Sequence, residues 1–170
     1  NIYTESKSLQ EEWGDYFLWL DGGDQFQGTI ECMLSEGNVM KDFYNYAKIN
    51  GIARGNHEFD YVIQKLKDFY KLQKFPTLCA NLYDVNEKKY IWEEGMWENV
   101  EPYHIYELGK ETKIKIGVIG LATKETVAFT SEDLSSLEFR SYIESTKPFV
   151  NILRNEEKVD AVILLTHFGF

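Results

Sequence analysis

Residues 16–24 read Tyr-Phe-Leu-Trp-Leu-Asp-Gly-Gly-Asp, an apolar run that ends in a cluster of turn-forming residues. A continuous apolar run of this length is typical of a strand that is buried on both faces of a sheet. Asp and Gly are residues that readily end such a strand in a tight turn. We therefore predict a buried strand over residues 16–20, followed by a polar loop that begins at Asp21.

The rest of the sequence alternates strand patterns with helix patterns. Apolar positions at three- and four-residue steps predict a helix over residues 30–49, interrupted at Gly37, and a second helix over 59–72. Further helices are expected at 141–155, which contains Pro148, and at 4–13, where the pattern is that of the end of a surface helix. Strands are predicted at 52–54, 77–83, 101–108, 113–121 and 159–166, and a charged surface insertion at 86–97. This alternation predicts an α/β fold, in which helices pack on a sheet.

The composition excludes several classes of protein. With 44% hydrophobic and 15% aromatic residues, the chain can form a packed core and is not a disordered segment. Its net charge of −10 argues against nucleic acid as a partner, and no apolar run approaches the roughly 20 residues that a membrane-spanning helix requires. An anionic substrate would need a bound metal ion to neutralise its charge. Cys32 and Cys79 could form one disulfide, which the sequence does not decide.

Polar residues of the kinds that bind metal ions follow three of the predicted strands. They occur in Leu-Asp-Gly-Gly-Asp-Gln-Phe-Gln-Gly-Thr at residues 20–29, in Gly-Asn-His-Glu-Phe-Asp at 55–60, and in Leu-Thr-His-Phe-Gly at 165–169. Open α/β sheets place their sites beyond the carboxyl ends of strands. The three segments are therefore candidates for one shared site.

The first segment has simpler interpretations. The spacing from Gly23 to Gly28 is that of a phosphate-binding P-loop, but Thr29 stands where that motif has lysine. A calcium loop is excluded because Gln25 replaces the Asp or Asn that such a loop requires. An ordinary Asp/Gly turn remains an alternative.

The other two segments can also be explained without a site. Asn56 could cap the following helix, with Glu58 favoured by the positive end of that helix. A histidine at the end of a buried strand, such as His167, is about as often a core residue as a ligand. His104 lies within a predicted strand, without a neighbouring motif, and we assign it no role.

Taken together, the segments resemble the dinuclear calcineurin-like metallophosphoesterases. Gly23-Asp24, the Gly-Asn-His-Glu run at 55–58 and Thr166-His167 occur in the order found in that family. The longer strings at 20–29 and 55–60 resemble its 5'-nucleotidase group, as do residues 75–82 and 116–126. The resemblance extends over essentially all 170 residues and implies an α/β/β/α sandwich of mixed sheets flanked by helices.

The resemblance also implies roles for individual residues. Asp24 is the expected carboxylate bridging two divalent metal ions, with zinc the leading candidate and manganese, magnesium or calcium the others. Asn56 and His167 are expected ligands of the second metal. His57 is the expected catalytic histidine that assists the leaving oxygen, and Asp60 the carboxylate that orients it.

Two of the family's motifs are not found in the sequence. No Asp-x-His precedes Asp24, and only three residues follow His167, where Gly-His-x-His is expected. We therefore expect residues 1–170 to be a partial N-terminal catalytic domain, incomplete at both ends, without the C-terminal nucleotide-binding domain and without activity of its own.

The function implied for the whole protein is hydrolysis of a phosphate ester, most simply a nucleoside 5'-monophosphate. The expected partner is thus a small phosphate ester or nucleotide. The family further implies a location outside the cell, at its surface or in the periplasm. A non-catalytic relative that uses the fold as a binding module is the alternative.

Overall fold

The computed structural model describes residues 1–130 and 132–168. Its strands form three sheets. A parallel sheet has the order β1 (Leu20–Asp21), β2 (Gly51–Ala53), β3 (Thr77–Leu78), β6 (Val100–Glu101). A mixed sheet has the order β10 (Ala161–Thr166), β8 (Ile114–Leu121), β7 (Tyr103–Leu108). A small antiparallel sheet has the order β5 (Lys89–Tyr90), β4 (Leu82–Asp84), β9 (Leu137–Phe139).

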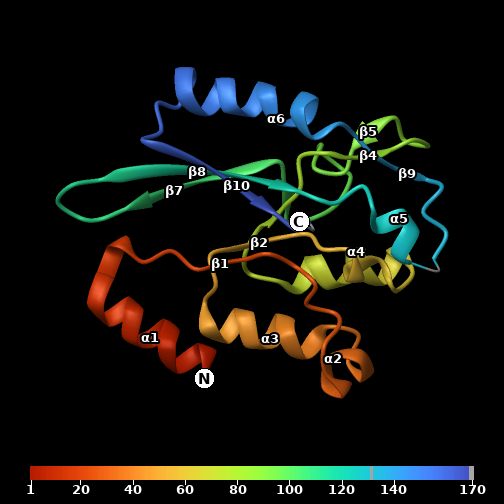
Figure 1. The fold of residues 1–170 in the computed structure, drawn as a ribbon, viewed down its shortest axis with the longest axis horizontal. Coiled ribbons are helices and arrows are strands. Elements are labelled where there is room, and N and C mark those ends of the chain that lie inside the picture. The colour runs from red at the N-terminus through yellow and green to blue at the C-terminus, as the bar shows by residue number, and fades with distance from the viewer. Residues whose placement is uncertain (131, 169–170) are drawn as a thin grey trace.

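Helices cover the outer faces of the first two sheets. Those described are α1 (Ile2–Trp13), α2 (Ile30–Leu34), α3 (Asn38–Ala47), α4 (Ile63–Leu72), α5 (Thr126–Phe129) and α6 (Tyr142–Asn151). Figure 1 shows α6 on one side of the sheets, and α1 and α3 on the opposite side. No helix in the described part of the chain is both long and apolar enough to cross a membrane.

The sheets pack against each other through apolar side chains. Leu78 of β3 lies with Tyr106 of β7 and Val118 of β8 in one buried cluster. Tyr44 of α3 packs with Ile52 of β2 on the outer side of the parallel sheet. Phe149, Leu153 and Ile119 form the corresponding layer beneath α6. These layers confirm the predicted α/β/β/α sandwich of mixed sheets.

Most predicted elements are present, and Gly37 does interrupt the predicted helix over 30–49. Gly37 has φ +79, and a Cβ there would lie 1.7 Å from the ring of Phe26, so the chain must bend at a glycine. Pro148 lies inside α6 without ending it, and a wider turn over Ile152–Glu156 extends the helix. The helix predicted over 4–13 begins at Ile2, two residues before the predicted start, and the side chain of Asn1 accepts the N–H of Thr4 at 3.0 Å.

The strand predicted over 16–20 is wrong in extent. Gly14–Tyr16 form a 3-10 turn, and only Leu20–Asp21 pair as a strand. The backbone N–H of Trp19 donates to the side chain of Asn50 at 2.8 Å instead of to a neighbouring strand. Most of the apolar run over residues 16–20 therefore lies beside the parallel sheet without forming backbone hydrogen bonds of the sheet.

The prediction over 77–83 is also wrong, because that segment crosses between sheets. Buried Asn81 interrupts it, accepting the N–H of Ala122 and donating to the carbonyl of Ala122, each at 2.9 Å. Helix α4 likewise starts at Ile63 rather than at residue 59, and Val62 and Leu72 of the predicted apolar stripe are exposed.

Two expectations about burial need correction, and the structure decides the open question of a disulfide. Segment 86–97 is not wholly a surface insertion, since Ile91 and Trp97 lie in the core. Strand β10 is not buried: Leu164 is 50% exposed, because β10 is an edge strand that pairs only with β8 among the described residues. Cys32 and Cys79 are both free and buried, so they form no disulfide.

The contact between the two sheets gives a stability prediction. A Cβ at Gly120 of β8 would lie 2.0 Å from the carbonyl oxygen of Leu78 in β3. Gly120→Ala should therefore lower the free energy of unfolding by about 1–3 kcal/mol, as overpacking does, measured by chemical denaturation. The control is Gly22→Ala, whose new Cβ would lie at an ordinary contact distance, 3.9 Å, from the carbonyl oxygen of Thr166. Equal stability of the two variants would contradict the prediction.

Candidate active site

The candidate site lies where β1, β2 and β10 end. Asp24 follows β1, His57 follows β2, and His167 directly follows β10. Asp24 and His57 line one cleft of about 510 Å³, together with Gln27, Gly28 and Met33.

Two glycines allow the first two loops to touch. A Cβ at Gly23 would lie 2.4 Å from the backbone nitrogen of Gly55, and a Cβ at Gly55 would lie 2.1 Å from Oδ1 of Asp24. Asp24 itself has φ 67, a left-handed conformation that is uncommon for a residue other than glycine. Strain of this kind persists only where surrounding contacts hold it.

Buried Glu58 provides those contacts. Its Oε2 accepts the N–H groups of Gly55 at 2.6 Å and Asp24 at 3.1 Å, and its Oε1 accepts the N–H of Gln25 at 2.7 Å. Burial raises the pKa of Glu58, and the nearby charge of Asp24 adds to this effect; together they outweigh the three backbone hydrogen bonds. We call this arrangement of Glu58 with the backbone of residues 24, 25 and 55 the Glu58 clasp.

His57 is held at both its backbone and its ring. Its N–H donates to Oδ1 of Asp24 at 2.9 Å, and its Nδ1 lies 2.7 Å from Oδ2 of Asp60. Burial lowers the pKa of His57, but the hydrogen bond to Asp60 and the charges of Asp24, Asp60 and Glu58 outweigh it, so the pKa is raised. The structure therefore places the two predicted catalytic residues in direct contact.

His167 reaches Asp24 from the other sheet. Its Nδ1 lies 2.9 Å from the carbonyl oxygen of Gly22, and its Nε2 lies 2.9 Å from Oδ2 of Asp24. Side-chain exposure is 30% for His167 and 26% for Asp24, so this is not a core histidine. Parallel pairing of β10 with β8 brings the end of β10 to this loop.

Asn56 lies half-buried between Gly55 and His57. Its side chain makes no capping hydrogen bond to the turn over His57–Phe59. The helix-cap interpretation of Asn56 is therefore wrong, and so is the associated explanation of Glu58, which faces backbone N–H groups of two loops instead. The P-loop interpretation of residues 23–29 is not supported either. Thr29, which stands where a P-loop has lysine, caps α2 by accepting the N–H of Cys32 at 3.3 Å.

Known proteins resemble this chain in sequence and in fold. No family model matches the chain. A 5'-nucleotidase of Vibrio cholerae is 35% identical over 162 residues, which are 94% of this chain and 27% of that protein. The crystal structure of a 5'-nucleotidase precursor from Thermus thermophilus covers 99% of this chain and 31% of its own, with a TM-score of 0.79 and 27% identity. The chain is similar, in sequence and in fold, to part of these 5'-nucleotidases.

The chain also has the fold of the calcineurin-like phosphoesterases. The calcineurin-like phosphoesterase YfkN of Bacillus subtilis matches all of the chain with a TM-score of 0.75 and 23% identity, over 54% of its own chain. The chain spans about a quarter of the length of the curated relatives it matches.

The residues present fit a divalent metal ion. The carbonyl of Gly22 can only accept, so Nδ1 of His167 bears a proton, and the other ring nitrogen, Nε2, is directed at Oδ2 of Asp24. Two lone pairs 2.9 Å apart repel each other unless a proton or a cation lies between them. Imidazole nitrogen and carboxylate oxygen are both ordinary ligands of zinc. Within residues 1–130 and 132–168, however, no group of three or more His, Cys, Asp or Glu is placed to hold a metal.

The sequence did not reveal what three residues around the site do. Glu58 and Gln27 both lie within the quoted strings, but only their contacts reveal what they do. Arg54 is fully buried before Gly55, with its guanidinium carbon 4.8–5.1 Å from the rings of Phe59, Tyr70 and Trp97. Aromatic faces stabilise such a cation. His104, in contrast, lies elsewhere, paired with Glu101 at 2.7 Å.

The Glu58 clasp gives a stability prediction. Glu58→Gln retains the shape of the side chain but turns an amide NH2 toward backbone N–H donors that need an acceptor. Leaving such buried donors unpaired costs about 1–3 kcal/mol, so the melting temperature should fall, as measured by circular dichroism. Glu12→Gln, at an exposed position of α1, is the control. A Glu58→Gln variant as stable as that control would contradict the proposed bonds.

Proposed function

We propose that this chain forms part of the active site of a metal-dependent phosphoesterase, which hydrolyses a nucleoside 5'-monophosphate to nucleoside and phosphate. The observation that supports it best is the meeting of Asp24, His57 and His167 at one place, from three segments far apart in the sequence. Homology to 5'-nucleotidases points to the same chemistry. The charge of −10 is consistent with a site that uses metal ions rather than lysines to neutralise phosphate.

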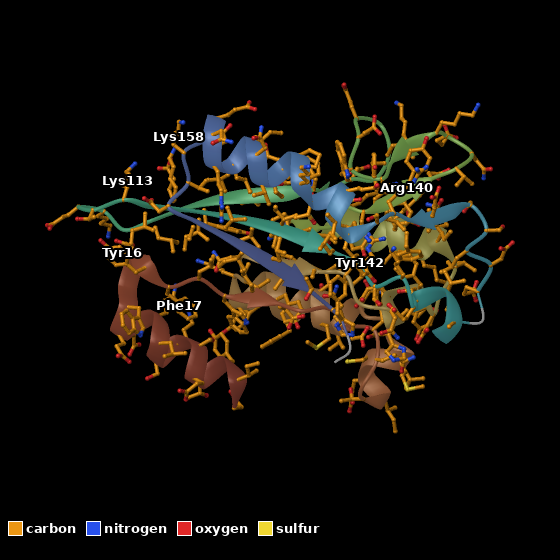
Figure 2. All side chains as sticks on the ribbon, turned by 45° about the horizontal axis from the view of Figure 1, so that its top comes forward. Tyr16, Phe17, Lys113, Arg140, Tyr142 and Lys158 are labelled. Atoms are coloured by element: carbon orange, nitrogen blue, oxygen red, sulfur yellow. The ribbon has the colours of Figure 1, made fainter. Side chains whose placement is uncertain are left out.

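Asp24, Asn56 and His167 are the residues that would hold metal in this proposal. Asp24 is suited to bridge two ions because a carboxylate has two acceptor oxygens. When bound, two divalent cations would neutralise the phosphate oxygens and make a water molecule nucleophilic near neutral pH. Two of the chain's lysines, Lys113 and Lys158, lie at the far end of the mixed sheet from Tyr142 (Figure 2).

His57 supplies the proton in this proposal. With its Nδ1–H donated to Asp60, the ring leaves Nε2 as the atom available to a ligand. The raised pKa of His57 favours the imidazolium form, whose Nε2–H can donate to the oxygen of the leaving alcohol. Asp60 holds the ring in place and stabilises its positive charge.

We further propose that residues 1–170 are part of a larger catalytic domain and that a separate domain binds the nucleoside. The upstream and downstream metal-binding motifs of the family would complete both metal shells. A location outside the cytoplasm belongs to the same proposal, and cell fractionation of the full-length protein tests it.

Assay of the 170-residue chain tests its proposed inactivity. Incubated with AMP and zinc, manganese, magnesium or calcium, it should release no more phosphate than its Asp24→Ala variant. The reason is that three ligands cannot hold two metal ions in working geometry. Metal-stimulated release that Asp24→Ala abolishes would overturn the proposed inactivity while supporting the site.

Assay of the full-length protein tests the role of His57. His57→Ala should lower kcat for AMP by about 10²–10⁴-fold, the range typical of a general acid. His104→Ala, a histidine outside the cleft, is the matched control and should retain full activity. Unchanged turnover in His57→Ala would rule out the assignment, and a full-length protein inactive on every phosphate ester would favour the binding-module alternative.

A further inference from the structure

Gln27 makes a contact that the proposed catalytic pair does not account for. Its Nε2 donates to Oδ2 of Asp60 at 2.8 Å. The same oxygen lies 2.7 Å from Nδ1 of His57. One carboxylate oxygen thus receives two donors, one from the loop after β1 and one from the turn after β2.

The chemistry of the three groups fixes which atoms carry protons. A carboxylate oxygen only accepts, so Gln27 must present its NH2 to Asp60 and His57 must present Nδ1–H. The side chain of Asp60 is 19% exposed, so water competes little for that oxygen.

The backbone of Gln27 is also held firmly. Phe26, the preceding residue, is 2% exposed, and its ring packs edge-on against Phe69 at 4.8 Å and lies against Gly37. Gly28, which follows, has φ +118, a conformation that favours glycine. Gln27 therefore extends toward Asp60 from a fixed point, and lines the same cleft as His57 and Asp24.

We propose that Gln27 is a positioning residue: by sharing Oδ2 of Asp60 with His57, it holds that carboxylate in the orientation that keeps His57 in its Nδ1–H tautomer. The inference rests on the proposed function for its catalytic meaning. The effect of Gln27 on the tautomer of the His57 ring, however, does not depend on that function. Holding Nδ1–H on Asp60 matters because, in the neutral ring and in the imidazolium alike, it leaves Nε2 as the atom that can face the reacting phosphate ester.

The tautomer of His57 can be measured directly. Long-range ¹H–¹⁵N correlation spectra of the 170-residue chain, at a pH where His57 is neutral, distinguish Nδ1–H from Nε2–H. The Nδ1–H form should dominate in the unaltered chain. In Gln27→Met, which keeps the length of the side chain but removes the donor, the ratio of the two tautomers should fall about threefold to tenfold, as expected for one lost hydrogen bond.

Two further variants make the result decisive. Gln27→Asn keeps the amide but shortens its reach, so it should lower the ratio as well, which guards against a folding defect peculiar to Gln27→Met. Gln25→Met is the matched control, because the side-chain amide of Gln25 has no hydrogen-bond partner among the described residues. An unaltered tautomer ratio in both Gln27 variants, with spectra as dispersed as the parent's, would overturn the proposal.

Kinetics of the full-length protein separate this inference from the proposed function. Gln27→Met should lower kcat about threefold to tenfold and change KM less than about twofold, because Gln27 acts through His57. A raised KM with unchanged kcat would overturn positioning in favour of substrate contact. Absence of hydrolysis by the unaltered protein would overturn the proposed function and leave the tautomer measurement valid.

Discussion

The candidate site depends on the buried carboxylate of Glu58. Its two oxygens accept backbone N–H groups from the loop after β1 and from the loop after β2, so two segments more than 30 residues apart are held as one unit. Hydrogen bonds to a charged group are stronger than neutral ones, and burial strengthens them further. With these bonds in place, Asp24 can remain in a left-handed conformation that its side chain would not otherwise favour.

The sandwich supplies the third side of the site. Parallel pairing of β10 with β8 directs the carboxyl end of β10 toward the loop after β1. There, His167 contacts both the carbonyl of Gly22 and the carboxylate of Asp24. The apolar layer between the sheets sets this distance, because close-packed side chains fix the separation of the strands that bear the site. The apolar packing between the sheets therefore determines how far apart the polar residues of the site lie.

The sequence was a good guide to the order of elements and to the polar residues after the strands. Periodic apolar spacing predicted the helices, and Gly37 marked their interruption correctly. The two strands whose extent was predicted wrongly are those in which a side chain replaces backbone pairing: Asn50 binds the backbone of Trp19, and Asn81 binds Ala122 where the chain crosses between sheets. Local pattern cannot reveal these contacts, because the partners lie 31 and 41 residues away.

For the site, the sequence alone determined which residue types follow which strands, and with them the resemblance to dinuclear phosphoesterases. Tertiary structure decided what each of those residues touches. Glu58 proved to join two loops rather than favour a helix end, Gln27 gained a partner in Asp60, and β10 lies exposed at a sheet edge despite its apolar sequence. The physical reason is that hydrogen-bond partners and burial depend on distances between segments, which residue order does not encode locally.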